Sequence, residues 1–297
     1  VLRMELTFRH VSVVTECELR NILEKKNGFL LETGKGRFSA QKIIFATGLL
    51  AAPKTGSDGS AIPLIKAFGH RFSDIVPALT ALQCRESFFR QLAGIRTEAE
   101  VSLFIAGENI ISERGELQLT DYGISGIPVF QVSRFAAKAL YNKQEVTAVL
   151  NFMPQMSEEE FTVFLAERAR LRPQKTAEEF LTGLFHKKMI ALWVKCSRIS
   201  KEKPVGTYSE EELRTLVRLI QQFEVNVEGT NSFEQAQVCC GGVSTEEVKE
   251  DTLESSYVPG VYFAGEILDV DGICGGYNLQ FAWSSGWIAG LLVVDIG

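Results

Sequence analysis

The pattern of apolar and polar residues is most informative near the end of the chain. A short apolar run, Val261 to Ala264, is typical of a buried parallel strand, and Gly265 ends it. A loop rich in glycines and acids follows, and a buried, apolar helix of small residues is predicted over 278–290. Because ligands of α/β proteins bind beyond the carboxyl ends of the strands, this order predicts a ligand crevice rather than an ordinary strand-to-helix turn. The unpaired N–H groups at the helix start would suit an electron-rich group.

The first part of the chain alternates in the manner of short strands. The first residues and 11–14 predict strand, and further strands are predicted over 19–23, 28–32 and 36–39, with Gly34-Lys35-Gly36 as a hairpin turn. An apolar run over 42–46 then predicts a buried strand that ends at Thr47-Gly48.

The middle of the chain predicts an antiparallel β-domain, either a barrel or a sandwich. Its strands are predicted over 101–106, 109–112, 115–119 and 146–152, and a returning strand over 223–229. A helix is predicted over 128–141, with Pro128 at its start, where the missing N–H is tolerated. The segment Tyr122 to Gly126 before it is either a structural Ω-loop or a loop that approaches a ligand.

Three capping boxes predict a helical segment over 156–222. Each pairs an N-cap hydroxyl with a glutamate three residues later: Ser157 with Glu160, Thr176 with Glu179, and Ser209 with Glu212. Apolar residues recur at helical spacing after each box. We expect Met189 and Trp193 to be packing residues, and the scattered lysines here to form a solvated helical face.

Composition narrows the class of protein. The 297 residues are 45% hydrophobic and carry a net charge of −6, which gives no indication of a nucleic-acid or anionic-membrane partner. No apolar run is long enough to span a bilayer and no signal peptide opens the chain, so a cytoplasmic location is expected. The six cysteines form no CxxC pair and the three histidines are widely spaced, which predicts no metal site. The adjacent Cys239 and Cys240 are expected to be buried small residues, whereas Cys274 lies nearer the predicted crevice.

Three motifs together resemble one family. The stretch from Tyr262 to Gly290 resembles the C-terminal flavin motif of the HI0933-like (YhiN/BaiN-type) FAD-dependent oxidoreductases. Residues 236–244 are similar to a segment just upstream of that motif, and Ala46-Thr47-Gly48 resembles its ATG segment. The resemblance implies an α/β fold, namely a partial FAD/NAD(P)-binding Rossmann-like domain with an inserted β-barrel or sandwich that carries a helical subdomain. The implied domains are an FAD-binding domain made of residues 1–73 and 236–297, an inserted β-domain made of residues 74–155 and 223–235, and a helical subdomain made of residues 156–222.

The resemblance also implies the cofactor site. FAD is the implied cofactor, NAD(P)H is a candidate co-substrate, and no catalytic acid or base stands out. The residues implied to contact FAD are Leu19 (near the adenine), Ala46, Thr47, Gly48, Gly265, Glu266, Asp269, Val270, Asp271, Gly275, Gly276, Tyr277, Asn278 and Leu279. Leu49 departs from the second glycine of many relatives, and its side chain is expected to narrow the approach of the flavin.

A second departure concerns the phosphate-binding unit. The GxGxxG that would hold the FAD pyrophosphate at a helix N-terminus does not occur in these residues. We therefore expect a family member that begins inside its own FAD domain, and an isolated chain that binds FAD weakly and is inactive.

The function expected is that of a flavin-dependent oxidoreductase acting on a small organic substrate, with no nucleic-acid or membrane partner. Two other classes stay open. One is a catalytically inactive scaffold that does not retain FAD. The other is an RNA-associated protein, which only the basic residues of the helical segment suggest and against which the net charge of −6 argues.

Overall fold

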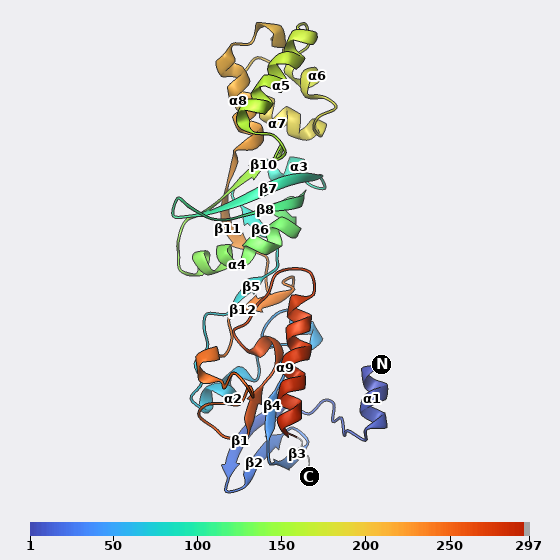
Figure 1. Ribbon diagram of the computed structural model, residues 1–297, viewed down its shortest axis with the longest axis vertical. Helices are drawn as coiled ribbons and strands as arrows, with labels where there is room; N and C mark the ends of the chain where they lie inside the picture. The colour runs from blue at the N-terminus through green and yellow to red at the C-terminus, as the bar shows by residue number, and fades with distance from the viewer. Residues whose placement is uncertain (294–297) are drawn as a thin grey trace.

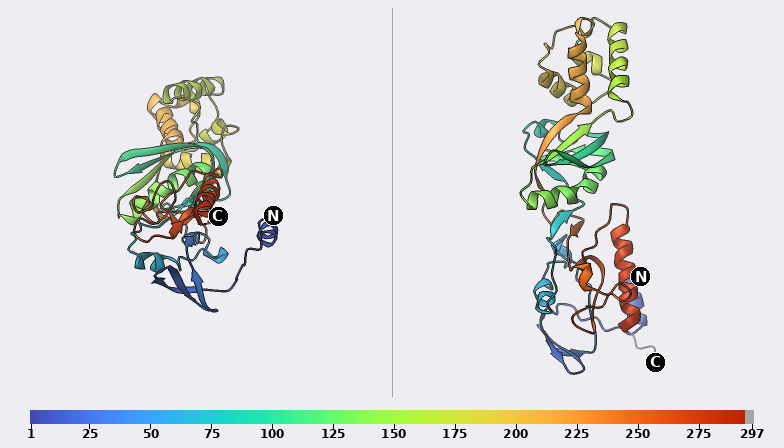
Figure 2. Two further views of the ribbon diagram at one scale, coloured as in Figure 1. Left: turned by 60° about the horizontal axis from the view of Figure 1, so that its bottom comes forward. Right: turned by 60° about the vertical axis from the view of Figure 1, so that its left-hand side comes forward.

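The computed structural model describes residues 1–293 and has three parts arranged one after another along its long axis (Figures 1 and 2). A part that contains strands β1–β4 and β13 and helix α9 lies at one end, a β-barrel in the middle and a helical subdomain at the other end (Figure 1). The chain runs from the first part into the barrel and from the barrel into the helical subdomain. It then returns through the barrel to the first part. The first part therefore contains both ends of the described chain.

The first part is organised around a pair of parallel strands. Strand β4 (Ile43–Phe45) pairs in parallel with β13 (Val261–Phe263), although more than two hundred residues separate them in sequence. The two strands bury Phe45 and Phe263, whose rings stack at 5.9 Å. Around this pair lies an antiparallel sheet of β1 (Leu19–Lys25), β2 (Gly28–Thr33) and β3 (Gly36–Ala40). Four short helices, η1 (Pro53–Thr55), α2 (Ile62–Ala67), η3 (Thr245–Glu247) and η4 (Gly265–Ile267), and the long helix α9 (Tyr277–Val293) complete this part.

The strand prediction for the first residues is wrong. Residues Leu2–Phe8 form helix α1, in which Glu5 and Arg9 make an i,i+4 ion pair of 2.6 Å, and residues 11–14 belong to no strand. A strand requires a neighbour to satisfy its backbone groups, and none of the described residues pairs with 11–14. The hairpin predicted at Gly34-Lys35-Gly36 is confirmed, because β2 and β3 pair from Thr33 and Gly36 onward.

Two short antiparallel strands, β5 (Val76–Ala78) and β12 (Val238–Cys240), connect the first part to the barrel (Figure 1). The barrel is closed, which decides between the barrel and the sandwich, and all of its pairs are antiparallel. Its strands are β6 (Leu82–Cys84), β7 (Arg96–Ile105), β8 (Glu108–Leu119), β9 (Gly123–Gly126), β10 (Val146–Asn151) and β11 (Phe223–Thr230). Helix α4 (Ile127–Tyr141) packs on it, and helix α3 (Phe89–Leu92) contributes Phe89 and Leu92 to the same buried cluster.

Two expectations for the insert are corrected. The strands predicted over 109–112 and 115–119 are one strand, β8, which pairs with β7 along most of its length. The Ω-loop alternative for 122–126 is wrong, because Gly123–Gly126 is strand β9. A Cβ at Gly123 would lie 2.3 Å from the carbonyl oxygen of Leu82, so glycine permits this close strand pairing.

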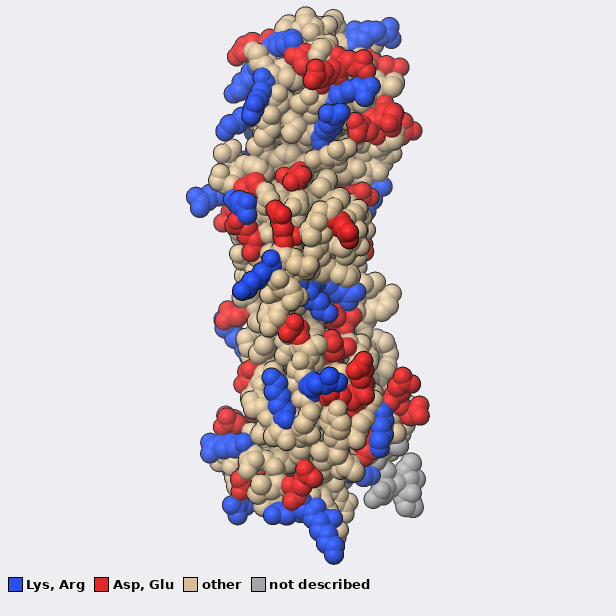
Figure 3. All heavy atoms as spheres, turned by 90° about the vertical axis from the view of Figure 1, so that its left-hand side faces the viewer, with Lys and Arg blue, Asp and Glu red and all other residues tan. Residues whose placement is uncertain are grey.

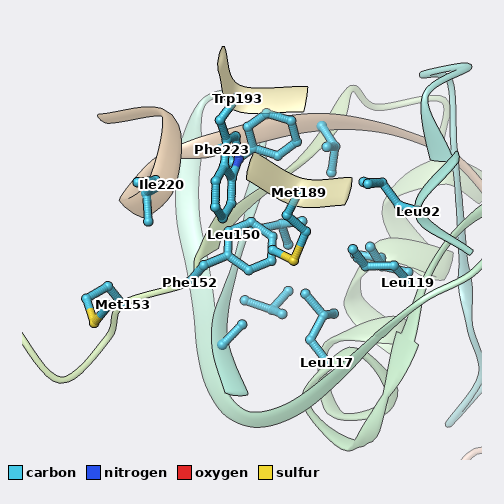
Figure 4. Close-up of a cluster of buried hydrophobic side chains, with 14 of the residues drawn as sticks. Leu92, Leu117, Leu119, Leu150, Phe152, Met153, Met189, Trp193, Ile220 and Phe223 are labelled. Carbon is cyan, nitrogen blue, oxygen red and sulfur yellow. The ribbon is translucent and has the colours of Figure 1, made fainter. Parts of the chain in front are cut away.

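The helical subdomain forms as its caps predict. All three capping boxes are present, at the starts of α5 (Glu158–Leu171), α6 (Ala177–Leu181) and α8 (Glu210–Gln221). Helix α7 (Lys187–Ser197) and η2 (Val205–Thr207) complete it. Met189 and Trp193 of α7 are buried against Phe152 and Phe223 at the end of the barrel, which confirms that they are packing residues (Figure 4).

Candidate functional site

The parallel strand pair brings the two predicted cofactor segments together. Because β4 and β13 run in the same direction, both end at the same edge, and the Thr47-Gly48 turn lies beside η4. Glu266 joins them: one carboxylate oxygen accepts from the N–H of Leu49 at 3.4 Å, and the other accepts from the N–H of Cys239 at 2.8 Å. The Glu266 carboxylate thus connects three segments by hydrogen bonds: β12, the turn after β4 and its own segment after β13.

The loop after η4 follows a defined path. The N–H of Asp269 donates to the carbonyl of Val243, and a Cβ at Gly242 would come within 2.6–2.8 Å of the backbone at 267–269. Further along, the Asn278 side chain closes the loop, because it accepts from the N–H of Gly272 at 2.8 Å and donates to its carbonyl at 2.9 Å. The loop is therefore held at both ends before α9 begins.

A cavity of about 410 Å³ lies between this loop, the start of α9 and the connecting strands. Gly275 and Gly276 line it with φ angles of +114° and +95°, which favour glycine. The backbone N–H groups of 277–279, in the first turn of α9, have no hydrogen-bond acceptor among the described residues. The cavity therefore has glycine backbone and the positive end of a 17-residue helix on one side.

Helix α4 of the barrel holds the same loop from the other side. Gln131, Arg134 and Lys138 recur at helical spacing on one face of α4. The Gln131 side chain accepts from the N–H of Cys274 at 2.9 Å, and Arg134 donates to the carboxylate of Asp271 at 2.8 Å and to its carbonyl at 3.0 Å. The Asp271 carboxylate also accepts from the thiol of Cys240 at 3.1 Å. The barrel thus fixes the geometry of the loop.

The titratable groups of the site are shifted mainly by burial. Burial raises the pKa of Glu266, which the two backbone N–H donors partly offset. Burial also raises the pKa of Cys239 to about 12 and that of Cys240 to about 11, the latter with help from Asp271. Both thiols are free and buried, which confirms the interpretation of the pair as buried small residues. They are protonated at neutral pH, which makes them poor nucleophiles.

The predicted contact residues divide into those that line the cavity, those that lie near it, and Leu19. Lining the cavity are Glu266, Val270, Gly275, Gly276, Asn278 and Leu279. Seven further residues lie near the cavity but do not line it: Ala46, Thr47, Gly48, Gly265, Asp269, Asp271 and Tyr277. Leu19 does not line the cavity either; it begins β1, where it pairs with Thr33. Leu49 does not narrow the approach as expected, because its side chain is fully buried in the core of the first part.

Several lining residues were missed from the sequence. They are Leu79, Gln237, Val238, Ile273, Phe281 and Ala282. Cys274 also lines the cavity, as its predicted proximity to the crevice led us to expect. The contact of α4 with the loop was also missed. The one available indication in the sequence was the helical spacing of the polar residues Gln131, Arg134 and Lys138 in an otherwise apolar helix. The expectation that α9 is buried holds for Ser285 and Ala289 but not for its outer face, where Leu279, Trp283 and Trp287 are exposed.

Comparison with known proteins defines the class. The family model of the HI0933-like protein Rossmann domain matches residues 1–292, so the chain belongs to the HI0933-like family. It is 41% identical over 290 residues to the 3-dehydro-bile acid delta(4,6)-reductase of Clostridium scindens, and the match covers 98% of this chain and 71% of that protein.

Two further relatives act on RNA by name. The chain is 28% identical over 272 residues to the ribosomal RNA dihydrouridine synthase of Haemophilus influenzae, and 27% over 270 residues to that of Escherichia coli. Each match covers 91% of this chain, and it spans 64% and 65% of those two proteins. Among residues 1–293 no helix is long and apolar enough to cross a membrane.

Proposed function

We propose that this protein is a flavin-dependent oxidoreductase that binds FAD in the cavity at the start of α9. The observation that carries the proposal is the cradle itself: two positive-φ glycines and three N–H groups without acceptors among the described residues face a cavity beyond two parallel strands. An electron-rich ring edge satisfies such N–H groups, and the helix dipole favours negative charge there. The residues present therefore fit the flavin.

Each part of the site has a proposed role. The first turn of α9 would hold the electron-rich edge of the ring, and Gly275 and Gly276 would let it approach the backbone. We assign Thr47, Gly48 and Glu266 to the sugar-like chain next to the ring, which is supported by the closeness of Glu266 to the Gly48-Leu49 backbone. When bound, FAD supplies hydride transfer, and the protein supplies binding, orientation and electrostatics.

The chemistry that the relatives' names have in common supports a proposal for the substrate class. A delta(4,6)-reductase of a 3-dehydro bile acid and a dihydrouridine synthase both saturate a C=C bond conjugated to a carbonyl. We propose the same chemistry here: a hydride equivalent and a proton add across the C=C bond while NAD(P)H is oxidised to NAD(P)⁺. The small conjugated ring is the part of the substrate that must enter the site.

A flavin-retention experiment tests the proposal against the alternative of a scaffold without FAD. Gly276→Val places a side chain in the cavity, whereas Gly183→Val is a matched control outside it. Both glycines have φ near +90°, and a Cβ at either would meet no atom within 4 Å. Purified protein is incubated with FAD and desalted, and the ratio of flavin to protein is read from the visible spectrum.

We expect Gly276→Val to lower FAD affinity at least about tenfold, which corresponds to about 1.4 kcal/mol, and Gly183→Val to leave it unchanged. Oxidation of NADH and NADPH in the presence of a small cyclic enone then tests the reaction. Because the GxGxxG unit does not occur in these residues and weak FAD binding is expected of them, the scaffold is supported only if the chain joined to such a unit also remains colourless and does not quench FAD fluorescence.

A further inference from the structure

The cavity at α9 has two kinds of lining. The glycine loop and the first turn of α9 contribute backbone, and this is the part that we assign to the flavin. The segments that connect the first part to the barrel contribute side chains instead: Leu79 follows β5, and Gln237 and Val238 lie at the start of β12. Because Val238 pairs with Ala78, the sheet holds these two segments side by side at the cavity.

The backbone is strained where it passes the cavity at Leu79. This buried leucine has a φ of +50°, a left-handed conformation that residues other than glycine seldom adopt. Its carbonyl accepts from the N–H of Gln237 at 3.5 Å. Strain of this kind persists only where the surrounding structure imposes it, and it is concentrated at ligand sites. The strained turn thus also restrains the backbone of Gln237.

Gln237 contributes the one uncommitted amide of the lining. Three side chains in the described lining carry oxygen or nitrogen, namely those of Gln237, Glu266 and Asn278. Both oxygens of Glu266 accept from backbone N–H groups, and the Asn278 amide closes its own loop. The Gln237 side chain is exposed and has no hydrogen-bond partner among the described residues. Its amide is therefore free to bind a ligand.

The rest of the lining favours a neutral ligand. Glu266 is the only charged residue among the described residues of the lining, and its two oxygens are already engaged. On the face drawn in Figure 3, acidic and basic side chains are interspersed rather than gathered by sign. Most other lining residues are apolar, including Leu79, Val238, Val270, Ile273, Leu279 and Phe281. Apolar walls with one free amide fit a neutral ring that carries one hydrogen-bonding group.

An amide donor has a defined use in the proposed reaction. A hydride equivalent from NAD(P)H adds to the carbon of the C=C bond that is farther from the carbonyl, and the π electrons move onto the carbonyl oxygen. The resulting enolate returns its electrons to the other carbon, which takes a proton from water. An N–H donor at the oxygen stabilises negative charge that develops only during the reaction, and glutamine side chains serve in this way.

We propose that the side-chain N–H of Gln237 donates to the carbonyl oxygen of the conjugated substrate, while Leu79 and Val238 contact its ring. The inference rests on the proposed reaction and adds a catalytic residue to a site in which the sequence indicated none. The strands that connect the first part to the barrel thus form the substrate side of the cavity.

The test compares Gln237→Leu, which removes the amide and keeps a side chain of similar size, with the control Gln235→Leu. Gln235 is exposed, lies in the same segment and does not line the cavity. Cyclohexenone is titrated into isotope-labelled protein with an excess of FAD, and side-chain amide signals are followed by NMR. The Gln237 signal, identified by its absence from the Gln237→Leu spectrum, should shift, and the Gln235 signal should not.

The two halves of the reaction are then followed separately by the absorbance of the flavin. Gln237→Leu should slow reoxidation of the reduced flavin by cyclohexenone at least about tenfold, because loss of one preorganised donor to a developing oxyanion typically costs about a hundredfold or more. Reduction of the flavin by NAD(P)H and the affinity for FAD should stay unchanged. Gln235→Leu should match the unmodified protein in every measurement.

The outcomes separate this inference from the proposed function. If flavin is bound and the enone is reduced, a Gln237 signal that does not shift, or equal enone rates in the two variants, would overturn only the inference. Weaker FAD binding by Gln237→Leu would also overturn it, because the amide would then contact the flavin. A shift of the Gln237 signal in a protein that retains no flavin, even when joined to a GxGxxG unit, would refute only the proposed function. Absence of both would refute both.

Discussion

Arg134 of the barrel and Asp271 of the loop before α9 form a two-point contact between different parts of the molecule. The guanidinium donates to the Asp271 carboxylate at 2.8 Å and to its carbonyl at 3.0 Å, and both side chains are largely shielded from solvent. The ion pair orients the side chain, and the carbonyl bond also restrains the backbone. The loop that forms the cavity therefore depends on the barrel for its position.

Replacing Arg134 by glutamine should lower FAD affinity about tenfold, because a partly buried carboxylate then loses its charged partner and the loop is released. Equilibrium titration of FAD fluorescence measures the effect. Arg114→Gln is the control, since its 3.0 Å pair with Glu98 is exposed and such pairs contribute at most about 1 kcal/mol. Equal flavin affinity in both variants would show that the loop keeps its position without α4.

Replacing Glu266 by alanine should lower the free energy of unfolding by about 1–3 kcal/mol, because the N–H groups of Leu49 and Cys239 lose their acceptor. Urea denaturation followed by circular dichroism measures this. Glu228→Ala removes a carboxylate from an exposed pair with Arg85 and should cost less than about 1 kcal/mol. A Glu266→Ala protein as stable as this control would contradict the proposed anchoring role.

Gly242→Ala should be more destabilising than Gly36→Ala by about 1–3 kcal/mol, which is the usual cost of adding a methyl group to a site that has no space for it. Both glycines have positive φ, at +144° and +117°, so both substitutions strain the backbone. Only at Gly242 would the new Cβ meet backbone atoms at 2.6–2.8 Å, whereas at Gly36 it meets none within 4 Å. Thermal melting of the two variants tests the prediction. An equal loss of stability in both would mean that the backbone at 267–269 shifts to accommodate the methyl group at little cost.

A buried histidine should make stability depend on pH. His70 is fully enclosed, with Nε2 2.7 Å from the hydroxyl of Ser255 and Nδ1 3.3 Å from the carboxylate of Glu247. Burial lowers the pKa of His70 more than Glu247 raises it. The neutral ring is therefore favoured in the folded state, and its contribution is complete above the unfolded pKa of about 6.5 and is lost as the pH falls below it.

We expect the free energy of unfolding to fall as the pH is lowered below about 6.5, with a slope of at most about 1.4 kcal/mol per pH unit from this residue. Urea midpoints across this range measure it, and His70→Gln should flatten the dependence. Glu247 acts in a separate window: burial raises its pKa, but bonds from Arg71 outweigh this and hold it at about 2. Its contribution is lost only below about pH 4.5. Stability that rises on acidification from pH 6.5 would contradict the assignment to His70.

Much of the fold was predictable because its signals are local. A capping box such as Ser157 with Glu160 satisfies backbone groups within a single turn, so the helices of the outer subdomain could be located from spacing alone. The alternation of apolar and polar residues in β7 likewise predicts a strand with one buried face, and the apolar run of β13 predicts a strand buried on both faces. The stretch over 262–290 indicated the cavity-lining glycines for the same reason, since it is continuous in sequence.

Contacts between distant segments were decided only by the tertiary structure. Closure of the barrel, the position of Arg134 against Asp271 and the burial of Leu49 each depend on residues far away in sequence, and no local pattern encodes such pairings. The strand predicted over 11–14 failed for the same reason, because a strand forms only where another backbone satisfies its hydrogen bonds. The sequence by itself determined which segments are helices, strands and glycine loops, whereas the folded chain decided which of them meet around the cavity.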